Sequence, residues 1–264
     1  MSPYGTISRR RFLRSSLIVC GCAACGGVGA ALSTRAWADA STRVKGAGYE
    51  LWFIGTQRET LANGKIAATL DLRALAGQPD VYGLGPIEQL RGEVTIINSH
   101  STVATVAVDG KAQVEESFEI GVPFFVWSRV PAWLPVAIPL KVRSFEDLEG
   151  FVPKAAARAG LDPDKPFPFL VSGREKLIEF HILNRTSDGP HHLEMLKEIQ
   201  VTFTNKQKDA IIIGFHSTKH RGIFTPTDSN IHLHFQTPDD STSGHVTKLR
   251  LGFETTLSLP AAAV

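Results

Sequence analysis

After residue 38 the chain contains no cysteine, because all three cysteines of the sequence, Cys20, Cys22 and Cys25, lie before that point. Small secreted domains that lack a sufficient core are usually held by disulfides. Residues 39–264 have none available, but they are long enough to bury the core of one large or two small domains. We therefore exclude a disulfide-stapled scaffold and expect packed secondary structure.

Acidic residues are also absent from the first 38 positions, which instead contain five arginines. Ser8-Arg-Arg-Arg-Phe-Leu-Arg14 is typical of a twin-arginine signal, which is an address read by a receptor. The segment Leu17–Leu32 that follows is short and weakly apolar for a membrane span, and Ala36-Trp37-Ala38 offers a small-x-small cleavage site.

We therefore predict that residues 1–38 are a twin-arginine signal peptide. The export machinery for such signals is the expected partner, and the expected location is periplasmic or secreted, with no stable membrane anchor. A retained N-terminal anchor is the alternative.

Removing this segment reverses the sign of the charge. The whole chain has 28 basic and 26 acidic residues, and without the five arginines 23 basic residues remain, a net charge of −3. Since nucleic-acid-binding surfaces are strongly basic, this balance predicts no nucleic-acid partner.

Most of the remaining chain shows the two-residue alternation and β-branched content of strands. We expect strands at 49–54, 93–97, 102–108, 117–120, 124–129, 137–142, 177–183, 198–203, 210–216, 230–235, 245–251 and near 253–259. Asp109-Gly110 predicts a tight hairpin turn.

Helical patterns are few and short. Ala67–Ala76 is one candidate, and Ser144–Ala159 is a better one, in which Ser144 can cap the N-terminus. The proline-rich segment Asp162–Pro168 predicts an extended crossing between two halves of the chain. The predicted fold class is α+β, dominated by mixed or antiparallel sheet.

The clearest chemical signal is Ile231-His232-Leu233-His234-Phe235, followed ten residues later by Gly244-His245. Side chains alternate along a strand, so His232 and His234 share one face, roughly 6.6 Å apart. The intervening segment is turn-forming and can return His245 antiparallel to the same point. Three neutral imidazoles that leave open positions form the ligand set of a catalytic zinc site.

A His-x-His pair on a strand is also compatible with an ordinary half-exposed polar face. The ligand types alone leave copper, iron or nickel open beside zinc.

The histidine segment, from Gly214-Phe215-His216 through Gly222-Ile223 to His245-Val246, resembles the α-acetolactate decarboxylases. That family has His-Leu-His-Phe and Gly-Gly-His-Val at this spacing. The resemblance implies that His232, His234 and His245 are zinc ligands. It also implies two β-rich domains, 39–170 and 171–264, with the metal in the cleft between them.

Two further segments carry the resemblance. Leu90-Arg-Gly-Glu93 is similar to the family's Leu-Asp-Gly-Glu, which implies that Glu93 lies in the active site. Val122-Pro-Phe-Phe125 is similar to its Thr-Pro-Phe-Ala. Without the family, Glu93 is equally compatible with a solvated carboxylate.

An active-site arginine is also implied. Lys165-Pro-Phe-Pro-Phe-Leu170 is similar to the family's Lys-Pro-Tyr-Pro-Pro-Leu, and counting back from it without a gap places Arg158 at the arginine's position. The family's Arg-Thr-Val is here Arg158-Ala-Gly, so this assignment depends on spacing. The alternative is an exposed cation at a helix end.

The chain departs from the family at two further places. An insertion appears after Leu170 and includes His191-His192, which we interpret as an exposed turn in preference to a second metal site. The family's tail carries another active-site glutamate, for which Glu254 is the only nearby candidate. For His216 and His220 we expect a surface or loop role, with support of the ligands as the alternative, and no partner is evident for His100 or His181.

The resemblance implies an exported zinc-dependent carboxy-lyase that converts 2-acetolactate, or a similar 2-hydroxy-3-oxo acid, to acetoin and CO₂, with Glu93, Arg158 and Glu254 as catalytic residues. Two alternatives stay open: a non-catalytic metal- or ligand-binding protein on the same scaffold, and a metal lyase for a different hydroxy-keto acid. A homodimer also stays open.

Overall fold

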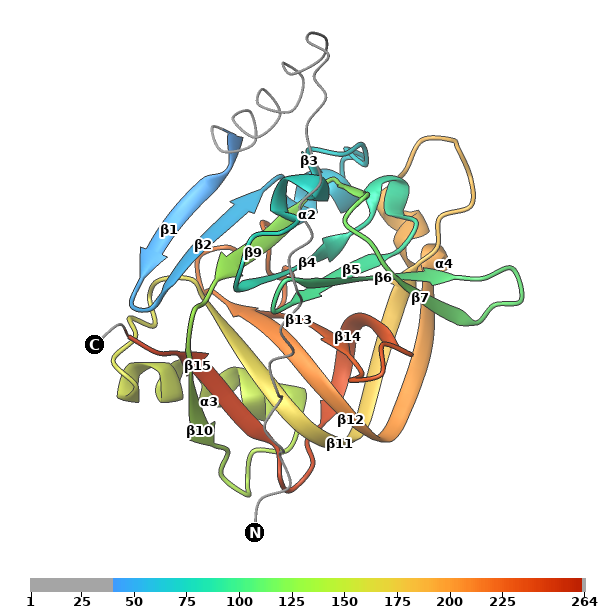
Figure 1. The fold of residues 1–264 in the computed structure, drawn as a ribbon. Coiled ribbons are helices and arrows are strands. Elements are labelled where there is room, and N and C mark those ends of the chain that lie inside the picture. The colour runs from blue at the N-terminus through green and yellow to red at the C-terminus, as the bar shows by residue number, and fades with distance from the viewer. Residues whose placement is uncertain (1–39, 263–264) are drawn as a thin grey trace, which may run out of the picture.

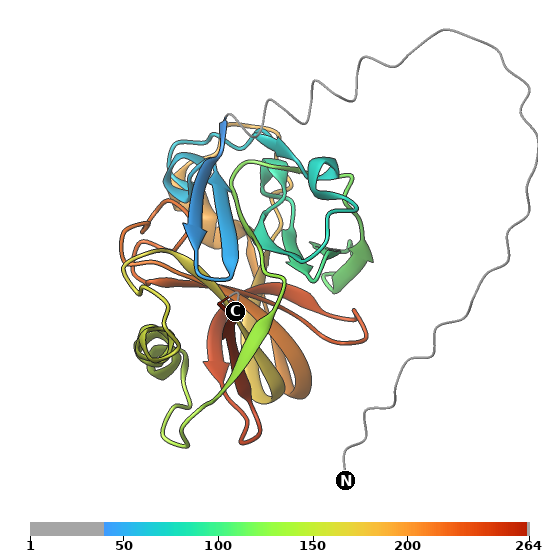
Figure 2. The same cartoon turned by 60° about the vertical axis from the view of Figure 1, so that its left-hand side comes forward.

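The computed structural model describes residues 40–262, so the predicted signal peptide lies outside the described residues. Within them the protein consists mainly of two antiparallel sheets, one above the other in Figures 1 and 2. The helices are few and short, as the α+β prediction required. No described helix combines the length and apolar character that a membrane crossing needs.

The seven-stranded sheet is built almost entirely from the first half of the chain. In spatial order its strands are β1 (Thr42–Gly46), β2 (Tyr49–Ile54), β9 (Phe125–Arg129), β4 (Val81–Pro86), β5 (Glu93–Ile97), β6 (His100–Val106) and β7 (Ala112–Glu116). The turn between β6 and β7 is the predicted hairpin: the Ala107 amide donates to the Lys111 carbonyl at 2.8 Å, and Gly110 has a φ of +80°.

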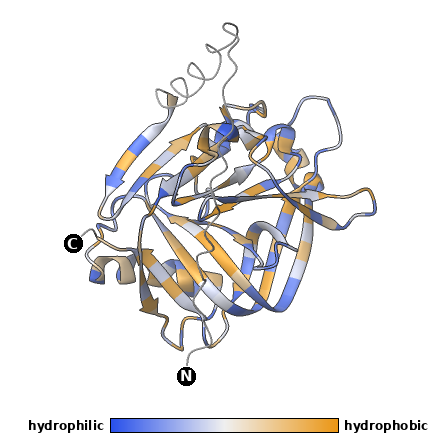
Figure 3. Cartoon of the chain, viewed as in Figure 1, coloured by the Kyte–Doolittle hydropathy of each residue, from blue (hydrophilic) through white to orange (hydrophobic). Residues whose placement is uncertain are grey.

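The six-stranded sheet carries the histidines. Its order is β10 (Trp133–Ala137), β15 (Thr256–Pro260), β11 (Phe167–Leu183), β12 (Gln200–His216), β13 (Ile231–Gln236) and β14 (Ser243–Arg250). β14 also pairs with β11, so β11, β12, β13 and β14 form a closed ring. Hydrophobic and hydrophilic residues alternate along its long strands in Figure 3.

Short elements complete the described structure. They are α2 (Gln57–Leu61), α3 (Phe145–Arg158), α4 (Leu196–Ile199), the 3-10 helices η1 (Leu72–Leu75), η2 (Glu88–Leu90) and η3 (Leu193–Met195), and the pair β3 (Leu70–Asp71) and β8 (Gly121–Val122). The predicted cap of α3 is confirmed: Ser144 Oγ accepts from the Asp147 amide, and the Asp147 carboxylate accepts from the Ser144 amide, each at 3.1 Å.

Three local predictions were wrong. The 67–76 segment forms β3 and η1, because Asp71 caps a 3-10 turn there. The 117–120 segment is not a strand, and β10 ends at Ala137, before Pro139 begins a turn closed by the Val142 amide.

Strand β4 was missed because Gly83 and Gly85 obscure its pattern. A Cβ at Gly83 would lie 2.7 Å from the Phe125 ring, and one at Gly85 would lie 2.6 Å from the Phe124 carbonyl oxygen. These glycines let the aromatic side chains of β9 lie directly against β4.

The two sheets share one hydrophobic core. Its largest cluster contains Leu51 and Leu84 from the seven-stranded sheet and Phe169, Phe215 and Phe235 from the other. β10, although it precedes residue 170, belongs to the six-stranded sheet. The division into domains at residue 170 stays a prediction.

Candidate active site

Strand register brings a row of histidines together across the ring. His234 on β13 lies directly opposite His245 on β14, and His245 lies directly opposite His181 on β11. Two residues before His234, His232 points to the same side, and the alternate residue Leu233 packs into the core. Adjacent strands and the two-residue alternation therefore suffice to gather these rings.

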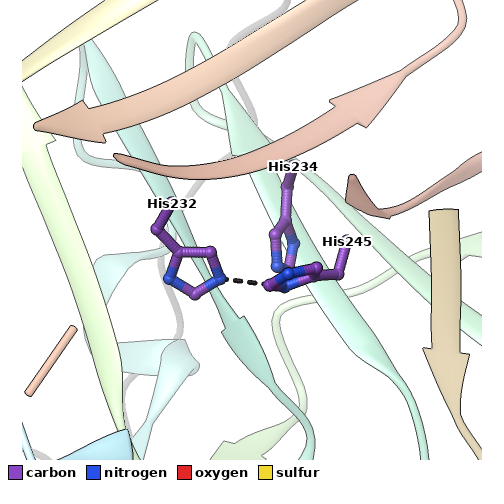
Figure 4. A group of neighbouring side chains, drawn as sticks. All are labelled: His232, His234 and His245. Atoms are coloured by element: carbon purple, nitrogen blue, oxygen red, sulfur yellow. Dashed lines mark hydrogen bonds between the residues drawn. The ribbon is translucent and has the colours of Figure 1, made fainter. Parts of the chain in front are cut away.

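Figure 4 shows the rings of His232, His234 and His245 pointing toward one another. Their potential ligand nitrogens all lie within 4.8 Å of one another. His232 Nε2 and His245 Nδ1 are only 3.0 Å apart. His234 Nε2 is buried and has no hydrogen-bond partner among the described residues.

The outer nitrogens of two of these rings are held by backbone carbonyls. His232 Nδ1 lies 2.7 Å from the Phe224 oxygen, and His234 Nδ1 lies 2.9 Å from the Val94 oxygen. With the Nδ1 proton donated to the carbonyl, each Nε2 lone pair faces the centre of the cluster. This orientation and the unpartnered His234 Nε2 fit a metal ion with imidazole ligands.

Burial favours the neutral imidazoles that metal binding needs. It lowers the pKa of His232 to about 4, against a weaker opposing effect of the Phe224 carbonyl. It also lowers the pKa values of His234 and His245 well below the ordinary value, and the neighbouring histidines add to both shifts. Since only the unprotonated ring nitrogen can coordinate, the cluster stays competent at mildly acidic pH.

Glu93, on β5 of the other sheet, faces the same cluster. Its Oε2 lies 3.6 Å from His234 Nε2 and its Oε1 lies 3.7 Å from His181 Nε2. The residue is only 2% exposed, and burial raises the pKa of its carboxyl group well above the ordinary value, opposed by the Leu183 backbone amide. A raised pKa favours the protonated form of this carboxyl group, which is the form that a general acid needs.

His181 is a residue of the site that the sequence did not reveal. Its ring stacks on that of His245 with centroids 4.4 Å apart, and its Nδ1 is buried without a hydrogen-bond partner in the described chain. Burial lowers its pKa to about 4. Only the register of β11 against β14, which pairs residues far apart in sequence, could have indicated it.

These groups lie along a cleft with a volume of about 870 Å³ between the two sheets. Glu93, His181, His232 and His245 line it together with residues of α2, α3 and the 193–196 segment. Its apolar lining includes Leu61, Phe124, Phe145, Leu193 and Leu196. Arg58 is the only cationic side chain that lines it within residues 40–262.

The structure does not bring the other two predicted catalytic residues to this cleft. Arg158 is exposed in the last turn of α3, and Glu254 is exposed in the turn between β14 and β15. Neither lines the cleft. Their catalytic roles stay predictions.

A buried arginine follows β11. Arg185-Thr186 has the first two residues of the Arg-Thr-Val motif but lies after Lys165, whereas the family's arginine precedes that lysine, so a count back from Lys165 does not reach it. The Arg185 amide donates to the Leu90 carbonyl at 3.0 Å, and its side chain, 2% exposed, donates to the Gly189 carbonyl. Its Nε has no partner among the described residues.

Three further histidines, His191, His216 and His220, contact residues outside the three-histidine cluster. His191 is buried with Nε2 3.0 Å from the Leu61 carbonyl oxygen, so the exposed turn predicted there applies only to His192. His216 is buried against Phe167, which contradicts a surface role. His220 stacks on Phe224, whose carbonyl holds His232.

The fold and the histidine cluster together define a β-rich protein with a histidine-lined cleft between two antiparallel sheets. The sequence model of the alpha-acetolactate decarboxylase family matches residues 53–262. The chain therefore belongs to the alpha-acetolactate decarboxylase family, which supports a decarboxylase-type activity.

Solved structures share this fold. The alpha-acetolactate decarboxylase of Bacillus subtilis strain 168 superposes with a TM-score of 0.61 at 17% identity, over 80% of this chain and 85% of that chain. A Staphylococcus aureus protein of unknown function, similar to alpha-acetolactate decarboxylase, superposes with a TM-score of 0.61 at 14% identity, over 79% and 84%. No curated protein matches the chain.

Proposed function

We propose that the protein is a zinc-dependent carboxy-lyase that converts 2-acetolactate, or a similar 2-hydroxy-3-oxo acid, to acetoin and CO₂. The observation that carries the proposal is the convergence of His232, His234 and His245 beside a buried glutamate in an open cleft. The same proposal includes export through the twin-arginine pathway, supported by the arginines of residues 9–14.

His232, His234 and His245 would hold the metal. A bound divalent ion would supply a Lewis acid that stabilises negative charge on substrate oxygens. Their shared face opens to the cleft through His232 and His245, so substrate can approach from that side.

The reaction needs a proton at one carbon. The bond between the carboxylate carbon and C2 breaks, CO₂ leaves, and the electron pair remains on the substrate. A proton must then reach C2. Glu93 is the group suited to deliver it, because burial favours the protonated form of its carboxyl group and because it lies beside the histidine cluster. His181, 3.7 Å from Glu93 Oε1, would orient this carboxyl group.

Arg185 is our candidate for holding the substrate carboxylate. Within residues 40–262 its guanidinium has only neutral hydrogen-bond partners, the Gly189 carbonyl and Gln89 Oε1, the latter at 3.5 Å. A buried guanidinium without a carboxylate is costly, which indicates an anionic partner in the working enzyme. Leu183, two residues before it, lines the cleft.

The cleft also supports a second candidate, a metal lyase for a larger hydroxy-keto acid. A volume of about 870 Å³ with leucine and phenylalanine walls can take an apolar substituent much larger than a methyl group. Turnover of 2-hydroxy-3-oxo acids with progressively longer alkyl groups would decide between the two: a maximum at acetolactate contradicts the larger substrate.

The main test is His234→Ala in the purified protein. We expect it to lose both bound zinc, measured by elemental mass spectrometry, and acetoin formation from racemic acetolactate. The matched control is His100→Ala, since His100 pairs with Asp240 and Glu116 and does not line the cleft. Retained zinc with unchanged turnover in His234→Ala would refute the proposal, and zinc without acetoin in the native protein would favour the non-catalytic alternative.

A further inference from the structure

Two β-turns at one end of the protein expose a large apolar side chain each. The first turn runs from Pro139 to Val142 and exposes Leu140, which is 72% accessible. The second lies between β14 and β15 and exposes Phe253, which is 68% accessible. Figures 1 and 2 both show these loops side by side at the lower edge of the molecule, one before α3 and one before β15.

Arg143 joins the two turns. Its carbonyl accepts from the Leu251 amide at 2.9 Å, and its Nη1 donates to the Gly252 carbonyl at 2.7 Å. Its guanidinium carbon lies 4.5 Å from the centroid of the Phe253 ring, and Lys176 Nζ lies 4.1 Å from the same centroid. The exposed phenylalanine is therefore flanked by two cations.

Hydrogen bonds to a buried carboxyl group fix the second turn. The buried carboxyl group of Glu175 accepts from the Gly252 amide at 2.9 Å and from Thr255 Oγ1 at 3.2 Å. Because both anchors are in the turn itself, Phe253 is presented to solvent on a fixed base and is not a side chain on a loose loop.

The cations around these tips lack acidic partners. Within residues 40–262 no ion pair involves Lys141, Arg143, Lys176 or Arg250. Strand pairing places Arg250 opposite Leu177, the neighbour of Lys176, and adjacent to Ser144.

The nearby acids do not cancel this charge. Asp147 is used by the capping interactions of α3, and Asp209 lies 3.9 Å from Arg174. Glu254 is the exposed acid of the second turn. Because hydrogen bonds from backbone amides leave the Asp147 carboxylate charged, four cations without an ion-pair partner face two exposed carboxylates, those of Asp147 and Glu254.

We propose that this surface, formed by Leu140, Lys141, Arg143, Lys176, Arg250 and Phe253, binds the anionic phospholipid surface of a membrane. Apolar tips can enter the headgroup layer, and the exposed cations Lys141, Lys176 and Arg250 can pair with lipid phosphates while their aliphatic stems remain in apolar contact. Arg143, whose Nη1 is held by the Gly252 carbonyl and whose Nη2 is buried, adds only its charge. The net charge of −3 on residues 39–264 means that the rest of the protein does not share this attraction. A surface for nucleic acid would have no need of the two protruding apolar side chains.

The chain provides a matched control at another turn. Val108 is fully exposed at the tip of the β6–β7 hairpin, but the neighbouring Lys111 is paired with Asp109 at 2.7 Å. It offers the same apolar exposure without unpaired cations.

The test is co-sedimentation of the purified protein with vesicles. We expect binding to vesicles that contain phosphatidylglycerol, little binding to pure phosphatidylcholine, and release by salt. Lys176→Glu should lower the partition coefficient by more than the roughly fivefold expected for loss of one cation, because it also adds an acid. Phe253→Ser should lower it as well, whereas Val108→Ser and Lys111→Glu should leave it unchanged.

Circular dichroism of each variant would verify folding, and Leu140→Ser provides a second apolar change at an independent turn. Equal binding to both kinds of vesicle, or no loss in either apolar variant, would overturn the proposal. Binding of duplex DNA that Phe253→Ser does not weaken would overturn it too, since it would identify a general polyanion surface.

Discussion

Two glutamates of this protein, Glu93 and Glu175, are almost equally buried, at 2% and 1% exposure, and differ in what surrounds them. Burial raises the pKa of both, opposed in each case by backbone hydrogen bonds. Glu175 is satisfied by Gly252 and Thr255, which it fixes in a turn. Glu93 lies 3.6–3.7 Å from two imidazoles and lines a cleft. The two glutamates therefore share their burial, and only Glu93 also lies beside histidines in a cleft, which is why we propose Glu93 and not Glu175 as the catalytic carboxyl group.

The largest expected effect is a loss of activity on substitution of Glu93, which substitution of Glu175 should not cause. Glu93→Gln should lower kcat by about 10²–10⁴-fold, the usual contribution of a general acid, because the amide cannot deliver a proton. Zinc content and secondary structure should stay as in the native protein. A variant that retains native kcat would mean that another group protonates the substrate.

A second pair, Arg185 and Arg158, compares a buried cation with an exposed one, neither of which lines the cleft itself. Arg185→Gln should reduce kcat/KM by roughly 10–150-fold, equivalent to the ~1.5–3 kcal/mol of a charged hydrogen bond. Arg158→Gln and Glu254→Gln, both at exposed positions, should leave it unchanged. Steady-state kinetics would measure this, with Arg58→Gln as the competing cleft cation, and a larger loss in Arg58→Gln would contradict our assignment.

Glu175→Gln should affect stability and leave turnover intact. Its new amide group would face the Gly252 amide or the Thr255 hydroxyl, so one buried donor loses its acceptor at a cost of about 1–3 kcal/mol. The midpoint of urea unfolding would report the loss. If Glu175→Gln lowered the activity and left the unfolding midpoint unchanged, our assignment of a structural role to Glu175 would be wrong.

The smallest expected effect is a difference in pH dependence. Glu93 has a higher pKa in the folded protein than in the unfolded chain. Its contribution to the free energy of unfolding is therefore complete below about pH 4.5 and is lost as the pH rises through the folded pKa. In metal-free protein, Glu93→Gln should therefore gain stability relative to the native chain as pH increases above 4.5. The buried histidines act in the opposite direction, but they are common to both chains and cancel in the difference. A difference that is constant with pH would show that Glu93 titrates normally.

Much of the fold and part of the site could be predicted from local sequence. The strands at 49–54 and 93–97 have the predicted bounds, and Ser144 caps its helix as expected. The alternation along 231–235 and the turn after it were enough to place His232, His234 and His245 together. Each of these features depends on neighbouring residues and a fixed backbone period.

What could not be predicted depends on pairing between distant segments. His181 joins the site because β11 pairs with β14, which no local pattern encodes. Arg158 was selected by counting along the chain, although helix α3 ends there and directs it to solvent. Distance in sequence gives no information on which strands close the ring.

The closure of β14 onto β11 also bears on how the site comes into existence during folding. Residue 245 must find residue 181 across more than sixty intervening positions, a non-local pairing of the kind that slows folding. Before that step the β13–β14 hairpin can already bring His232, His234 and His245 together, but it lacks the closed ring that buries them and the neighbouring His181. We therefore expect tight metal affinity to be a late product of folding, so a chain that meets metal too early would hold it on an open hairpin and exchange it freely.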